Sequence, residues 1–277
     1  MKIQTATKLA LKHIRRYVPT PNWTEHYPNL NELEQYKISA MCKTLLKETG
    51  NMVFAGPFSS MRLAANLELA SDPKIITGSY EEEVHSLINE IICTAPAQII
   101  DIGASLGYYA VGFALKIAHT TVIAFEAVEN PNWQQLAELA RINGVGDKIV
   151  QRGFCTAEEL EKVCRPQSFI LCDCEGGEED ILNPQLIPAL KSCTMLVELH
   201  EFYRPNVVGT LIDRFRGSHQ IKIIEETHRN PSQYRILNRL QRSWRRVAVE
   251  ETRYIQRHSS QIVTSMRFML LTPKLST

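Results

Sequence analysis

The sequence predicts an α/β fold, in which a doubly wound, Rossmann-like parallel sheet carries helices on both faces. From residue 79 onward, short apolar runs alternate with segments of helical periodicity, the order typical of β-α-β units. The runs are almost continuously apolar, which indicates strands that are buried on both faces. In such a sheet, ligands bind at the carboxyl ends of the strands, beside the point where the strand order reverses.

Each predicted element has a local signal. Apolar runs predict strands, and a Ser, Thr or Asn followed three positions later by Glu predicts a helix start. The predicted strands are 98–101, 121–125, 148–151, 169–172, 195–199, 221–224 and 263–272, the last of them at an edge of the sheet. The predicted helices are 31–49, one that begins with the Ser79–Glu82 capping box, 106–118, 132–142, one capped by Thr156, and 206–215.

The first 78 residues differ in pattern from the rest, because Gly, Pro and Ser interrupt residues 51–80. We therefore expect a helical and irregular extension over 1–78. A single domain should follow over 79–277, with a basic insertion at about 227–260. The stretch before Glu25 is basic and free of acids, which favours a docking helix. An interfacial membrane helix or a transit peptide is the alternative.

Composition excludes several classes of protein. The 277 residues have 22% charged side chains and a formal net charge of +1, which argues against wholesale disorder and against a protein that coats nucleic acid. No apolar run approaches about 18 residues, so no transmembrane segment is expected. The seven cysteines form no zinc-like pair of C-x-x-C units, which favours a reducing compartment and a cytoplasmic location.

The first predicted strand ends in a glycine turn that runs from Asp101 through Gly103 to Gly107. Glycines permit a tight turn, and the helix that follows offers unpaired N–H groups. The G-x-x-x-G spacing does not match the dinucleotide pattern, and the Asp101 carboxylate would repel a pyrophosphate. An aspartate suits a cationic amine, such as the amino-acid end of S-adenosylmethionine. The alternative is a glycine turn with a purely structural role.

Two further strand ends carry groups suited to a nucleoside. Glu126 ends the second strand about 20 residues after Gly103, where a carboxylate accepts hydrogen bonds from both ribose hydroxyls. The alternative is a solvated acid at a strand end. Gly153 and Phe154 end the third strand, where a backbone amide and an aromatic ring suit a purine.

Acidic residues follow the fourth strand, and a histidine follows the fifth. Asp173 directly ends an apolar strand, whereas a solvated loop leading into a helix explains residues 178–180. Alternation places Glu198 and His200 on the same side of the fifth strand. Carboxylates and imidazoles at this edge suit proton transfer. A divalent ion held by Asp173, Glu198 and His200 is the less favoured interpretation.

Together these residues resemble the FkbM-type S-adenosylmethionine-dependent methyltransferases. The matching stretches are IIDIGASLGYYAVGFAL (99–115), VIAFEAVENPNWQQLAELARINGV (122–145), FILCDCEGGEEDIL (169–182) and LVELHEF (196–202). The D-x-E-G-x-E element at 173–178 is the most distinctive, and the resemblance covers about residues 55–225. One departure is Ser105, where many methyltransferases have a third glycine.

The resemblance implies a Rossmann-like methyltransferase sheet, S-adenosylmethionine as cofactor, and a hydroxyl of a sugar, glycan or secondary metabolite as acceptor. It implies that four residues border the transferred methyl and the acceptor: Asp173, Glu175, Glu198 and His200. With the strand-end arguments above, the predicted cofactor-binding residues are Asp101, Gly103, Ala104, Ser105, Gly107, Tyr108, Glu126, Ala127, Gly153, Phe154 and Asp173.

The predicted insertion is strongly basic, with eight arginines against two glutamates over residues 227–257 and aromatic residues between them. A solvated, packed insertion is the favoured interpretation. The alternatives are a lid for an anionic acceptor and an RNA-binding surface. Two alternative functions therefore stay open: an RNA methyltransferase, and a non-catalytic protein that retained the cofactor fold. RNA is the second choice of acceptor, because the net charge of the chain is near zero. The sequence specifies neither the acceptor nor the number of subunits.

Overall fold

The computed structural model of this chain describes residues 32–127, 131–201, 203–227, 229–240, 245, 248–249 and 267–274. The basic segment before Glu25, the helix cap predicted at Asn31 and about half of the Arg-rich insertion lie outside the described residues. Among the helices that are described, none is long and apolar enough to cross a membrane.

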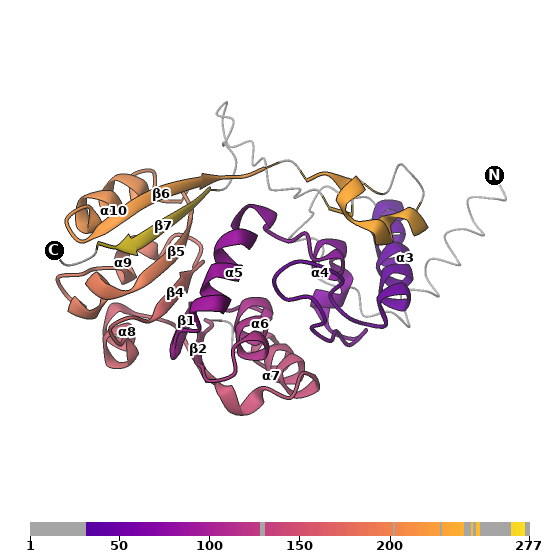
Figure 1. The fold of residues 1–277 in the computed structure, drawn as a ribbon, viewed down its shortest axis with the longest axis horizontal. Coiled ribbons are helices and arrows are strands. Elements are labelled where there is room, and N and C mark those ends of the chain that lie inside the picture. Colours follow the sequence, from indigo (N-terminus) through magenta and orange to yellow (C-terminus); the bar gives the residue numbers. More distant parts are fainter. Residues whose placement is uncertain are drawn as a thin grey trace.

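Seven described strands form one mixed sheet in the order β3-β2-β1-β4-β5-β7-β6 (Figure 1). Their bounds are β1 (Gln98–Ile102), β2 (Thr121–Phe125), β3 (Ile149–Arg152), β4 (Phe169–Cys172), β5 (Thr194–Leu199), β6 (His219–Glu225) and β7 (Arg267–Pro273). Strands β1 to β5 pair in parallel, and β7 is antiparallel to both β5 and β6. The order reverses between β1 and β4, which confirms the predicted doubly wound fold and places its switch point there.

Strand β7 corrects one prediction, because it lies between β5 and β6 rather than at an edge. Its residues Phe268, Met269 and Leu271 are buried, as expected for a strand with a neighbour on each side. The edges of the described sheet are β3 and β6. A late apolar run predicts a strand, but nothing in its own residues tells between which neighbours it inserts.

Helices cover both faces of the sheet, with α5, α6 and α7 on one side and α8, α9 and α10 on the other (Figure 1). The helix bounds are α3 (Glu32–Thr49), α4 (Pro73–Thr77), α5 (His85–Thr94), α6 (Tyr108–Lys116), α7 (Asn132–Ile142), α8 (Ala157–Val163), α9 (Glu178–Ile181) and α10 (Val207–Phe215). Short 3-10 helices are η1 (Glu68–Ser71), η2 (Glu82–Val84), η3 (Gly146–Lys148), η4 (Pro188–Ser192), η5 (Pro231–Gln233) and η6 (Arg235–Arg239). Thr156 caps α8 as predicted, since its hydroxyl accepts the Glu159 N–H at 3.2 Å.

Successive residues of the central strands enter two separate cores. On β1, Ile99 packs in the core shared with α3, α5, α6 and α7, whereas Ile100 and Ile102 pack in the core shared with α8, α9 and α10. Because side chains alternate along a strand, both cores require apolar residues, and the strand becomes continuously apolar. Asp101 is the exception, a carboxylate in the middle of a strand whose five residues are all buried.

The capping box predicted at Ser79 and Glu82 does not form. The Ser79 hydroxyl is buried, 3.0 Å from the hydroxyl of Thr77, and the chain makes the 3-10 turn η2 before α5 begins at His85. Val84 occupies the N-cap position of α5, and its apolar side chain makes no capping hydrogen bond. The prediction was wrong because Thr77 competes for the Ser79 hydroxyl that a box requires.

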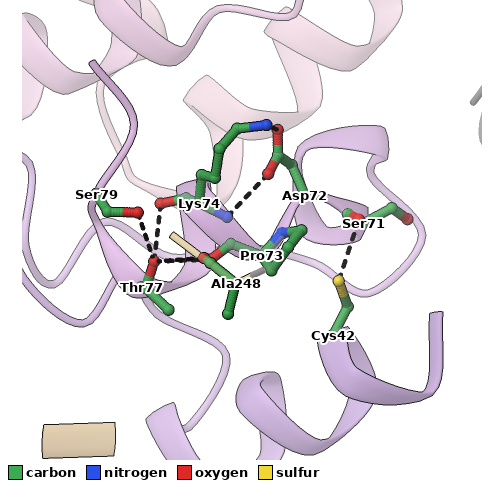
Figure 2. A network of polar contacts seen from close by, with 8 residues as sticks. All are labelled: Cys42, Ser71, Asp72, Pro73, Lys74, Thr77, Ser79 and Ala248. Atoms are coloured by element: carbon green, nitrogen blue, oxygen red, sulfur yellow. Dashed lines mark hydrogen bonds and ion pairs between the residues drawn. The ribbon is translucent and has the colours of Figure 1, made fainter. Parts of the chain in front are cut away.

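A polar network around α4 joins the N-terminal part of the chain to residue 248 (Figure 2). Asp72 caps α4 by accepting the Lys74 N–H at 2.8 Å, and its carboxylate pairs with the Lys74 ammonium at 3.2 Å. The Thr77 hydroxyl donates to the Pro73 carbonyl at 2.8 Å and lies 3.5 Å from the carbonyl oxygen of Ala248. Segments far apart in sequence therefore meet at this short helix.

The chain that leaves β6 crosses to the N-terminal helices, as the orange segment in Figure 1 shows. Arg229 pairs there with Glu83, and each side chain is only 1% exposed. Residues of η6 pack in the same core as α3, and Arg239 lies 3.4 Å from Glu48. The beginning of the basic insertion is thus packed against the N-terminal helices.

We predict that Glu83→Gln lowers the free energy of unfolding by about 3 kcal/mol, because it leaves the buried Arg229 guanidinium without its main counter-charge. Urea unfolding measures the loss. The matched control is Asp213→Asn, whose partner Arg216 is 72% exposed and whose loss should cost less than about 0.5 kcal/mol. Equal effects of the two substitutions would contradict the prediction.

Candidate functional site

The glycine turn after β1 lies at the carboxyl edge of the sheet, between the ends of β2 and β4. The N–H groups of Gly103 and Ala104 both donate to the Phe125 carbonyl, each at 2.9 Å. On the other side, the Asp173 N–H donates to the Ile102 carbonyl at 2.9 Å. The predicted cofactor turn is therefore fixed to both neighbouring strand ends by backbone hydrogen bonds.

Gly103 is required here for two reasons. Its φ is +86°, a backbone conformation that disfavours side chains, and a Cβ at this position would lie 1.6 Å from the Asp173 carbonyl oxygen. Gly107 has a φ of +90° and ends the turn against Leu136. Ser105 adopts a left-handed φ of 46° although it is not glycine. The departure from a third glycine thus leaves the left-handed turn intact.

Two carboxylates flank this turn. Asp101 is 2% exposed, and its pKa is raised to about 8, first by burial and then by the charges of Asp173 and Glu126, against a hydrogen bond from the Ala110 backbone. Glu126 is also buried, and its carboxylate accepts the Ser105 N–H at 2.7 Å. A cation next to Asp101 would favour its ionised form.

The remaining predicted cofactor residues occupy different environments. Phe154, just beyond β3, is 68% exposed, and Ala127, just beyond β2, is exposed too. Gly153 is partly buried. The Tyr108 ring lies in an aromatic core instead, with its centroid 5.2 Å from that of Phe58 in an edge-to-face contact. For Tyr108, only the backbone at the start of α6 belongs to the turn.

The imidazole of His200 is completely buried just beyond the end of β5. Its Nδ1 lies 2.6 Å from Glu178 Oε1, and its Nε2 lies 3.4 Å from Glu175 Oε2 and 3.5 Å from Asp173 Oδ1. The structure thus brings together three of the four residues predicted to border the transferred methyl. The fourth, Glu198, is a buried carboxylate on β5, opposite Phe268 of β7.

Glu178 also belongs to this cluster, although the sequence predicts a solvated acidic loop over residues 178–180. Its side chain is fully buried, and its Oε1 accepts the Gly176 N–H at 3.1 Å in addition to contacting His200. The signal was present, because Glu178 is the last residue of the D-x-E-G-x-E element.

The electrostatics of the cluster favour a charged imidazole. Burial acts to lower the pKa of His200, but the hydrogen bond to Glu178 and the charges of Asp173 and Glu175 outweigh it, so the pKa is raised. Burial acts to raise the pKa of Glu178, yet the hydrogen bond with His200 and backbone N–H groups prevail, and this pKa is lowered. The site is therefore built to hold positive charge among its carboxylates.

Comparisons with known proteins found solved structures with a distant likeness to this chain and no similar sequence. No protein-family model matches the sequence, and no curated protein is significantly similar to it. An O-methyltransferase from Bacillus cereus, solved with S-adenosylhomocysteine, shares 10% identity over 94% of this chain and 99% of that chain, with a TM-score of 0.43. An O-methyltransferase from Streptomyces achromogenes involved in tomaymycin synthesis, solved with S-adenosylmethionine, shares 11% identity over 93% and 97%, with a TM-score of 0.43. An rRNA methylase from Streptococcus thermophilus shares 9% identity over 69% and 96%, with a TM-score of 0.45.

We predict that Gly103→Ala destabilises the protein by at least about 3 kcal/mol, because the added Cβ would collide with backbone that cannot move aside. The matched control is Gly144→Ala. Gly144 also has a left-handed φ, +68°, but no other atom lies within 4 Å of its added Cβ, so only the conformational cost of about 1 kcal/mol applies. Urea unfolding compares the two variants, and similar losses would show that the close approach to Asp173 contributes little.

Proposed function

We propose that this chain is an S-adenosylmethionine-dependent methyltransferase of the FkbM type, which transfers a methyl group to a hydroxyl of a small molecule or glycan. One observation carries the proposal. At the switch point between β1 and β4, a buried Asp101, a glycine turn and a Glu126 bonded to that turn lie beside the Asp173–His200 cluster.

The residues present fit the parts of that cofactor. Asp101 suits its ammonium group, and the first-turn N–H groups of α6 suit its carboxylate. The Glu126 carboxylate has lone pairs for ribose hydroxyls besides the one that accepts the Ser105 N–H. The exposed ring of Phe154 offers a face for adenine at the adjacent strand end. The proposed binding path therefore runs from the β1 turn past β2 to β3.

When bound, S-adenosylmethionine supplies an electrophilic methyl carbon on a sulfonium. The protein holds the acceptor hydroxyl in line with that carbon, which removes most of the entropic part of the barrier. Asp173 and, in its neutral form, His200 are the proposed acceptors of the hydroxyl proton. The side chain of Asp173 is 35% exposed, so it is open to an acceptor. Glu175 and Glu198 are proposed to orient the acceptor and balance charge.

The position of the basic insertion supports an anionic acceptor. Strand β6 is antiparallel to β7, as β5 is, so the chain leaves β6 at the carboxyl edge of the sheet. It returns to the same edge, where Arg267 of β7 is opposite both Glu225 and Leu199. The Arg-rich segment is thus joined at both ends to the edge that carries His200. Arginine forks match carboxylate and phosphate groups.

We predict that the wild-type chain binds S-adenosylmethionine in isothermal calorimetry, and that Asp101→Asn and Glu126→Gln each raise the Kd by about tenfold or more, because each removes a charge-assisted hydrogen bond. Both substitutions keep the shape of the side chain. Asp147→Asn, at an exposed position in η3, is the control and should leave the Kd unchanged. Absence of binding by the wild-type chain would remove the proposed function.

We predict that release of S-adenosylhomocysteine is stimulated by hydroxyl acceptors in a panel of sugars, glycans and small metabolites, with carboxylated and phosphorylated members included. Asp173→Asn should lower kcat by about 100-fold, a larger factor than its effect on the cofactor Kd, because proton transfer is lost. Asp180→Asn, an exposed neighbour paired with Arg204, is the control. Stimulation by RNA alone would favour the RNA methyltransferase, and cofactor binding without turnover on any acceptor would favour the non-catalytic alternative.

A further inference from the structure

Asp173, Glu175 and His200 present three potential metal ligands to one point. One ligand atom from each lies within 4.8 Å of the other two. The three residues come from the end of β4 and the end of β5, so strands that pair in parallel bring them to the same edge. The set combines one imidazole nitrogen with two carboxylate oxygens, a mixture that suits a divalent cation of intermediate hardness.

The imidazole of His200 is oriented as metal-binding histidines are. Its Nδ1 is 2.6 Å from Glu178 Oε1, and both side chains are completely buried. A carboxylate on one ring nitrogen fixes the tautomer and makes the other nitrogen a better ligand, which is the usual arrangement around bound zinc. With the Nδ1 proton donated to Glu178, Nε2 is directed at Asp173 and Glu175.

The distances around Nε2 match those between ligands that share an ion. Nε2 is 3.4 and 3.5 Å from the two carboxylate oxygens, whereas charge-assisted N–H···O bonds measure about 2.7–2.9 Å. Atoms that share an ion with bonds of about 2.1 Å lie some 3–4 Å apart. The spacing around Nε2 is therefore that of ligands around a common centre.

Charge balance points the same way. Three carboxylates, those of Asp173, Glu175 and Glu178, surround one imidazole. Two nearby arginines interact with other acids: Arg204 lies 2.9 Å from Asp180, and Arg267 bonds to Glu201. The side chain of Glu175 is 70% exposed, which opens the cluster to ions from solvent.

We propose that Asp173, Glu175 and His200 bind a divalent cation, with Mn²⁺ as the best match to one nitrogen and two carboxylate ligands. The set differs from the ion site considered from the sequence, because Glu175 takes the place of Glu198. Binding of the ion stands on these contacts alone, whereas its role rests on the proposed function. There a cation held by these residues would lower the pKa of the acceptor hydroxyl, with His200 as a ligand instead of a base, and the second carboxylate oxygen of Asp173 would accept the proton.

The test is a titration of the chelator-treated full-length chain with MnCl₂, without any cofactor, in which the electron paramagnetic resonance signal of free Mn²⁺ reports the unbound ion. We expect one Mn²⁺ per chain. Glu175→Gln should raise the Kd at least about tenfold. Because Glu175 is largely exposed, this variant tests the ligand without disturbing the buried His200–Glu178 pair.

Asp180→Asn is the matched control, since it removes an exposed acid of the adjacent helix α9 that pairs with Arg204 and should leave the Kd within twofold of the wild-type value. An undiminished free Mn²⁺ signal with the wild-type chain, or equal binding by Glu175→Gln, would overturn the inference. Calorimetry with S-adenosylmethionine on the same sample separates the two ideas. Cofactor binding without Mn²⁺ binding leaves the proposed function standing, and Mn²⁺ binding without cofactor binding leaves only the ion site.

Discussion

The close approach of Gly103 to the backbone of Asp173 is the constraint on which the rest of the site depends. No side chain fits between them, because even a Cβ on Gly103 would lie 1.6 Å from the Asp173 carbonyl oxygen. The turn after β1 and the acidic segment after β4 are therefore adjacent by backbone packing alone. This contact lies where the strand order reverses, and it places the proposed cofactor groups next to the cluster around His200.

Burial of charge is the cost that accompanies this arrangement. Asp101, Glu178 and His200 have almost no exposed surface, and desolvation is the largest influence on the pKa of each. For His200 and Glu178 the partners reverse the effect of burial, so the pair is compensated within the fold. For Asp101 the charged neighbours do not reverse the effect of burial on the pKa, because they are the acids Asp173 and Glu126. Within this site, Asp101 is thus the group with most to gain from a cationic ligand.

The sequence was sufficient to predict the strands of the sheet, but it did not predict that β7 inserts between β5 and β6. β2, β4 and α7 begin and end at the residues predicted, because each is a continuous apolar or amphipathic run bounded by turn residues. The place of β7 depends on pairing with residues of β5 and β6 that are more than about 40 positions away in sequence, which local patterns do not encode. The Ser79–Glu82 box failed for a different, local reason, since the hydroxyl of Thr77, two residues earlier in the chain, lies 3.0 Å from the hydroxyl of Ser79.

Within the site, local sequence composition likewise does not show which of the acids at 178–180 is buried. Three consecutive acids begin α9, and one turn of helix directs them differently: Glu178 is buried against His200, while Asp180 is exposed and pairs with Arg204. Composition cannot rank such acids, because each is equally favourable at a helix N-terminus. The D-x-E-G-x-E spacing does rank them, since its last carboxylate, that of Glu178, is six residues after the end of β4 and contacts His200 just beyond β5. The net charge of +1 conceals a separation of charges. Acids lie at the strand ends, whereas many arginines lie in the segment over 227–257, which begins and ends beside those strand ends. A neutral total therefore carries little information about a site in which opposite charges are kept apart by the topology of the sheet.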